Sequence, residues 1–160
     1  DRIMTYGLVL SIIGAALAAA LAGIGSAIGV SIAGRAANGV LAEKPDLFGR
    51  VLVLQALPGT QGIYGFLLAV LILQKVGLLG GTPAVMTDWQ GWAMLGSALP
   101  IAIVGLLSGI AQGKVAATSI LMTGKKPDLM TRGMTMTALV ETYAILALLV
   151  SILMYSAVAI

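Results

Sequence analysis

One carboxylate in this sequence has a type and position that could carry chemistry. Glu141 lies in the apolar stretch ALVETYAILALLV, and no charged side chain follows it along the chain. An ionised acid in hydrocarbon is unfavourable by about 2.5–3.5 kcal/mol on insertion scales, and such acids usually serve a function. We therefore expect Glu141 to carry a positive ion inside a membrane. The alternative is a structural acid that stays protonated and donates a hydrogen bond to a neighbouring helix.

A group of polar residues in the stretch LQALPGTQGIYGFLL could complete a site with this acid. Leu57, Thr60, Gln61 and Tyr64 are spaced i, i+3, i+4 and i+7, which places them on one helical face. Pro58 lies among them and cannot donate a backbone hydrogen bond, so it predicts a kink that frees carbonyl oxygens. The alternative is a kink that serves packing alone.

Gln112, in SGIAQGKVA, adds a second amide group at the end of the third apolar stretch. Its alternative is an interfacial side chain that faces water. Lys114, two residues on, is expected to extend to the lipid headgroups rather than enter the site. The candidate set then offers one carboxylate, two amide oxygens, one hydroxyl and one freed carbonyl, in a sequence without Cys or His. Hard cations prefer such oxygen ligands.

The charge of this set limits the cargo to a monovalent ion, either Na⁺ or H⁺. One carboxylate neutralises one monovalent cation, and without a cation hydrocarbon favours the protonated acid. A proton carrier needs only the carboxyl group and one hydrogen-bond partner. Thr60, Gln61 and Gln112 would then be surplus polar groups, which are unfavourable when they are buried without partners. Their presence favours Na⁺ over H⁺.

The elements that must position these residues are membrane-spanning helices. The sequence has 160 residues, of which 59% are hydrophobic and only 9% are charged, whereas a soluble domain has about 25% charged residues. The net charge of +3 does not indicate a nucleic-acid partner, because the basic residues fall in short connectors. A span needs about 20 apolar residues. We predict an all-α membrane protein with four transmembrane helices, at residues 7–32, 51–76, 92–111 and 135–158.

A repeat relates the two halves of the chain. The sequence KPDL occurs at 44–47 and at 126–129, an offset of 82 that also pairs Ser26 with Ser108 and Arg50 with Arg132. We predict two tandem hairpins, residues 1–80 and 81–160, that enter the membrane in the same orientation. Such a parallel repeat differs from the inverted repeats of many transporters.

The two halves are not in the same register along their whole length. Near the candidate site an offset of 80 places Gln61 opposite Glu141, so the halves have drifted by two residues there.

The glycines of ALAAALAGIGSAIG in the first span are predicted to allow close helix packing. A phosphate-binding loop is the alternative, but no strand precedes these glycines.

The basic residues predict the orientation in the membrane. Lys75 is the basic residue of the middle connector and Arg2 that of the N-terminus. The other seven lie in or beside the first and third connectors: Arg35, Lys44, Arg50, Lys114, Lys125, Lys126 and Arg132. The positive-inside rule then places loops 33–50 and 112–134 in the cytoplasm and both termini outside.

The duplicated hairpin and the motifs LPGTQGIYGF, SGIAQGKVAA and VETYAIL resemble the membrane-rotor proteolipids of V-type ATPases, the 16-kDa c-type or K subunits, in their bacterial Na⁺-translocating form. The resemblance covers essentially the whole chain. It implies a homo-oligomeric ring in which the second and fourth spans carry the ion. It also implies a Na⁺ site made by the Leu57 carbonyl and the side chains of Thr60, Gln61, Gln112 and Glu141, with Tyr64 hydrogen-bonded to the carboxylate.

The resemblance further implies a non-catalytic subunit, since other subunits of the complex hydrolyse ATP. The loaded Glu141 would cross lipid as a neutral unit and release its ion at a stator subunit with a basic residue. A central-stalk subunit would dock at the cytoplasmic loops, and Li⁺ could replace Na⁺.

Three rival functions remain from the sequence. One is a H⁺-carrying ring of the same fold. A second is a structural pore or scaffold, which would need a continuous polar stripe along one helix, whereas the polar residues here cluster around Glu141. A third is a small multidrug-type transporter, which would need an aromatic pocket, whereas only 5% of the residues are aromatic.

Overall fold

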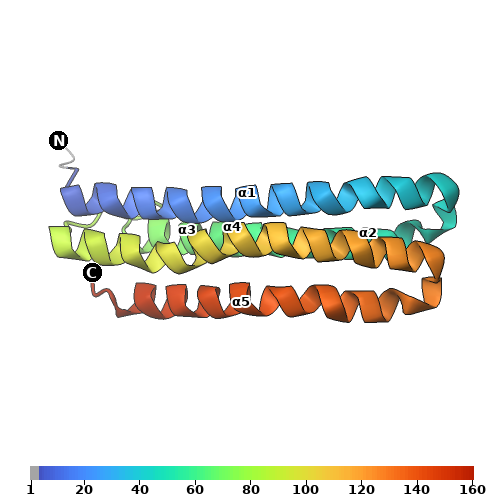
Figure 1. Cartoon of the computed structure of the whole chain (residues 1–160). Helices are drawn as coiled ribbons and strands as arrows, with labels where there is room; N and C mark the ends of the chain where they lie inside the picture. The colour runs from blue at the N-terminus through green and yellow to red at the C-terminus, as the bar shows by residue number, and fades with distance from the viewer. Residues whose placement is uncertain (1–3) are drawn as a thin grey trace.

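The computed structural model describes residues 4–160, and within them four long helical segments lie side by side (Figure 1). Each segment is long and apolar enough to cross a membrane, as the sequence predicts. The elements follow the chain in this order: α1 (Tyr6–Glu43), the 3₁₀ turn η1 (Pro45–Leu47), α2 (Phe48–Ala56), the 3₁₀ turn η2 (Leu57–Gly59), α3 (Thr60–Lys75), α4 (Asp88–Lys125), the 3₁₀ turn η3 (Pro127–Leu129) and α5 (Met130–Ala157).

The two halves fold as hairpins with the same turn. In each KPDL motif the proline opens a 3₁₀ turn, and the leucine N–H donates to the lysine carbonyl, at 3.1 Å for Leu47 and 2.9 Å for Leu129. The residue before a proline disfavours the helical conformation, so each long helix ends at this motif. Both turns lie at one end of the bundle, and the C-terminus and the α3–α4 connection lie at the other (Figure 1). The predicted parallel repeat of two hairpins is confirmed.

The hairpins meet through α1 and α4, which make the most extensive contact in the molecule. Gly25 and Gly29 of the first span lie at this contact, whereas nothing lies within 4 Å of a Cβ atom added to Gly23. A Cβ atom on Gly29 would overlap the carbonyl oxygen of Gly109, and one on Gly109 would lie 2.5 Å from the carbonyl carbon of Gly25. The backbones therefore touch, as small residues allow between helices in lipid. The packing role predicted for these glycines agrees with this arrangement at Gly25 and Gly29.

Two predicted loops are wrong over most of their length. The stretches 33–43 and 112–125 continue α1 and α4 as helix, so only a short turn separates each long helix from the next. Alanine, leucine and lysine in these stretches are good helix formers, and no proline interrupts them before Pro45 and Pro127. A hydropathy window ends where apolar residues end, whereas the helix ends where its backbone is interrupted. At 38 residues each helix is about 57 Å long.

The other span limits shift less. The second and fourth helical segments begin at Pro45 and Pro127, before the predicted starts at 51 and 135. The proposed division of the chain after residue 80 falls in the connection between α3 and α4, and it stays a prediction.

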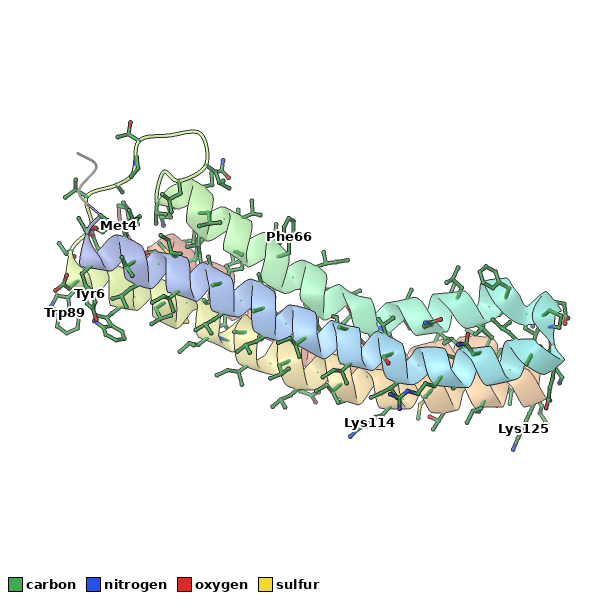
Figure 2. The ribbon with its side chains drawn as sticks, turned by 90° about the horizontal axis from the view of Figure 1, so that it is seen from above. Met4, Tyr6, Phe66, Trp89, Lys114 and Lys125 are labelled. Carbon is green, nitrogen blue, oxygen red and sulfur yellow. The ribbon has the colours of Figure 1, made fainter. Side chains whose placement is uncertain are left out.

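The second segment is broken where Pro58 predicts a kink. The 3₁₀ turn η2 separates α2 from α3, and the two helices meet at an angle in Figure 2. Near this break, the Gly62 N–H donates to Ser26 Oγ on α1 at 2.8 Å. The neighbouring helix thus supplies a partner beside the interrupted backbone, as lipid-buried structure requires.

Candidate ion-binding site

Glu141 lies on α5 and faces α3. It is half-buried and lies about 17 Å along the helix from Met130, the first residue of α5. The hydroxyl of Thr60 donates to Glu141 Oε1, and the hydroxyl of Tyr64 donates to the same oxygen at 3.2 Å. Thr60 and Tyr64 are four residues apart, so α3 presents both on one face. Two hydroxyl groups of α3 therefore hold one carboxylate oxygen of α5.

The break in the second segment adds further oxygens to this place. Thr60 Oγ1 lies 3.1 Å from the carbonyl oxygen of Leu57 and 3.3 Å from Gln61 Oε1, in addition to its contact with Glu141. A hydroxyl group has one proton, so it can satisfy only one of these three acceptors fully. The Thr60 backbone N–H also donates to the Leu57 carbonyl, and Tyr64 donates to Glu141 Oε1, yet the four clustered oxygens still have more lone pairs than protons. A cation is the species that such a group attracts.

Two buried amides join this oxygen cluster to α4. Gln61 and Gln112 are both completely buried. Gln61 Nε2 donates to Gln112 Oε1 at 2.6 Å and to Ser108 Oγ at 3.2 Å. Gln112 Nε2 donates to the carbonyl oxygen of Thr137 on α5 at 3.1 Å. The hydrogen-bonded network thus links α3, α4 and α5.

The structure brings every predicted site residue into this network. The Leu57 carbonyl and the Thr60, Gln61, Tyr64 and Glu141 side chains meet directly, as their spacing predicts. Gln112 joins the group through Gln61, because its amide oxygen accepts a hydrogen bond from the amide nitrogen of Gln61. The role of these residues as ion ligands stays a prediction.

Two residues near this network were not predicted from the sequence, and the structure places Lys114 outside it. Ser108 and Thr137 hold the amides of Gln61 and Gln112. The spacing i, i+4 between Ser108 and Gln112 was the signal that could have identified the serine. Lys114 is exposed and points away from the bundle (Figure 2), in agreement with a headgroup contact.

Sequence comparisons show which protein family the chain is similar to. The family model for the C subunit of ATP synthase matches residues 13–72 and again residues 95–154, two matches that are offset by 82 residues. The K subunit of the V-type sodium ATPase of Enterococcus hirae is 47% identical over 148 residues, which cover 92% of this chain and 91% of the relative.

Two further relatives are more distant. The K subunit of the A-type ATP synthase of Methanocaldococcus jannaschii is 40% identical over 94% of this chain and 64% of its own length. The 16 kDa proteolipid subunit of the V-type proton ATPase of Nephrops norvegicus is 27% identical over 94% of this chain and 92% of its own.

Proposed function

The chain belongs to the family of ATP synthase C subunits and is a non-catalytic rotor proteolipid of a V/A-type ATPase, and we propose that its cargo is Na⁺, bound at Glu141. The observation that carries the proposal is the surplus of oxygen lone pairs over protons around Thr60 Oγ1. A Na⁺ ion among these oxygens would balance both the surplus and the single carboxylate charge.

The proposed ligands come from three helical segments. The Leu57 carbonyl, Thr60 Oγ1, Gln61 Oε1 and the Glu141 carboxylate surround the ion. The amide oxygen of Gln112 joins them, because a carbonyl oxygen keeps a second lone pair beside the bond from Gln61. Tyr64 donates to the carboxylate and holds it in place. Li⁺ could occupy the same oxygen shell.

The relatives also favour Na⁺. The relative named as part of a sodium ATPase shares 47% of the aligned residues, whereas the Nephrops norvegicus relative named as part of a proton ATPase shares 27%. A protonated Glu141 is the alternative cargo state, since the hydroxyls of Thr60 and Tyr64 could also hold a neutral carboxyl group.

The proposed mechanism follows from the half-buried position of Glu141. Copies of the chain form a ring in the cell membrane, and the neutral pair of Glu141 and Na⁺ can travel through lipid without an uncompensated charge. At a stator subunit with a basic residue, the carboxylate is attracted and the ion leaves through a half-channel. Rotation is coupled to ATP hydrolysis or synthesis in other subunits, through a central stalk at the hairpin turns.

Protection of Glu141 from a carboxyl reagent tests the cargo. Dicyclohexylcarbodiimide modifies protonated carboxyl groups in apolar surroundings, so the purified ring in detergent is treated at mildly acidic to neutral pH. Mass spectrometry follows labelling at Glu141, and Glu141→Gln gives the background from other carboxyl groups. We expect millimolar Na⁺ to slow the labelling, while K⁺ at equal ionic strength leaves it unchanged.

Equal rates with and without Na⁺ would assign the site to H⁺. A Glu141 that reacts at no pH would contradict its role as the ion-carrying carboxylate.

A further inference from the structure

Two serines at equivalent positions of the repeat, on α1 and on α4, hold the first turn of α3. Ser26 on α1 accepts a hydrogen bond from the Gly62 N–H at 2.8 Å. Ser108 on α4 accepts one from Gln61 Nε2 at 3.2 Å. The two serines are 82 residues apart, the offset of the repeat. Ser26 thus contacts the backbone of α3, whereas Ser108 contacts the side chain of a candidate ligand on α3.

The hydroxyl of Ser108 is oriented toward Gln61 as an acceptor. Its oxygen lies 3.4 Å from the carbonyl oxygen of Val140, the residue before Glu141, so its proton is directed there. Its lone pairs are then left for Gln61 Nε2. Ser108 is buried, with 7% of its surface exposed, and no bulk water competes strongly for these bonds.

The amide of Gln61 is fixed at both of its hydrogens. One N–H donates to Ser108 Oγ and the other to Gln112 Oε1, which uses both donors of the amide nitrogen. A turned-over amide would lose both bonds and direct two N–H groups toward Thr60 and Glu141. A cation would meet donors there instead of an oxygen.

We propose that Ser108 is a positioning residue that keeps the amide oxygen of Gln61 directed at the ion. The inference rests on the proposed Na⁺ site and goes beyond it, because Ser108 touches no ion itself. Removal of its hydroxyl leaves Gln61 Nε2 with one acceptor, so the amide can turn over. The affinity for Na⁺ then falls, while the carboxyl group of Glu141 keeps its own hydroxyl partners.

The test compares Ser108→Ala with Ser97→Ala. Ser97 is a buried serine on the same helix whose hydroxyl donates to its own backbone, at Met94 O, 2.6 Å away. For each purified ring, carbodiimide labelling of Glu141 gives two quantities: the rate without Na⁺ and the Na⁺ concentration at half-protection. We expect Ser108→Ala to raise the second about two- to tenfold, as the loss of one hydrogen bond predicts. The rate without Na⁺ should stay the same.

The controls separate positioning from general damage. Ser97→Ala should change neither quantity, and Ser108→Thr, which keeps the hydroxyl, should restore the half-protection value. Half-protection in Ser108→Ala equal to that of Ser97→Ala would overturn the inference, and so would a changed labelling rate without Na⁺.

Two other results are also decisive. If Ser108→Ala does not assemble, Ser108→Cys replaces it, because a thiol is a weak acceptor. If Na⁺ fails to protect the unmodified ring, the proposed cargo is wrong and the role of Ser108 falls with it. The two failures can be distinguished, because the failure of the proposed cargo is seen in the unmodified ring, before any variant is made.

Discussion

At the scale of single residues, Tyr64 and Thr60 act on the same carboxylate oxygen in different ways. Thr60 Oγ1 also faces Leu57 and Gln61, so it belongs to the oxygen cluster. Tyr64 donates its hydroxyl proton to Glu141 Oε1 at 3.2 Å and lies beside Thr60. Its hydroxyl therefore fixes the carboxylate and is not one of the proposed ligands. Loss of this bond should loosen Glu141 and leave the other oxygens in place.

Tyr64→Phe should therefore weaken Na⁺ binding. One hydrogen bond to a charged group is lost, so we expect the Na⁺ concentration at half-protection of Glu141 to rise by about ten- to a hundredfold. The matched control is Tyr143→Phe, which lies two residues from Glu141 and is 68% exposed. An unchanged half-protection value in Tyr64→Phe would show that the tyrosine does not hold the carboxylate.

Most of this site could be predicted from residue types and spacing. Glu141 stands out because no other charge shares its apolar stretch, and Pro58 marks the break at which the Leu57 carbonyl lies. The orientation of the amides could not be predicted, since an amide carries donors and an acceptor at nearly the same place. Ser108 was missed because a serine in a helix rich in glycine and alanine resembles a packing residue.

At the scale of the elements, α1 supports the break in the second segment through one glycine. A Cβ atom on Gly29 would overlap the carbonyl oxygen of Gly109 and lie 3.0 Å from the Pro58 side chain. The α1–α4 contact and the 3₁₀ turn that presents the Leu57 carbonyl therefore both depend on the absence of a side chain at this position.

Gly29→Ala should consequently destabilise the fold and the site together. Overpacking of a tight contact costs about 1–3 kcal/mol, more than the helix propensity gained from alanine. The expected result is a lower unfolding temperature in detergent and weaker Na⁺ protection of Glu141. Gly39→Ala is the control on the same helix, because nothing lies within 4 Å of its added Cβ atom. Equal behaviour of the two variants would contradict the close approach of the helices.

The helices were predictable in number and order but not in length. Apolar content locates the part of a helix in hydrocarbon, and this gave all four segments. The same criterion ended the first at residue 32, whereas α1 continues to Glu43 with charged residues that can reach water. Proline in the KPDL motif decides the true end, and its effect is on the backbone rather than on hydropathy.

At the scale of the whole molecule, the parallel repeat gives the bundle two different ends. Both KPDL turns lie at one end (Figure 1). Seven of the nine Lys and Arg residues lie in or beside the two connectors that contain these turns. The opposite end holds the α3–α4 connection, Met4 and the aromatic side chains of Tyr6 and Trp89 (Figure 2). Tyr6 and Trp92 pack edge to face there, with ring centroids 6.4 Å apart. Arg2, part of the orientation argument, lies outside the described residues.

This asymmetry supports the prediction that the KPDL end is cytoplasmic. The positive-inside rule places Lys and Arg on that side, whereas tryptophan and tyrosine are frequent at both membrane interfaces and mark only the opposite end as interfacial. The same end would then present both turns of every copy to a central stalk. A ring of parallel hairpins gives the stalk one continuous rim, which hairpins of opposite orientation could not provide.

Labelling of single cysteines tests the orientation, because the sequence contains no cysteine of its own. Asp46→Cys and Asp128→Cys each place a thiol on an exposed residue of one KPDL turn, and Thr82→Cys places one in the α3–α4 connection. We expect a membrane-impermeant maleimide to label Thr82→Cys in intact cells. The two turn variants should react only in inverted vesicles, and faster after the soluble sector is stripped. Labelling of both turns from outside would reverse the orientation, while labelling of Asp46→Cys and Asp128→Cys from opposite sides would contradict the parallel repeat itself.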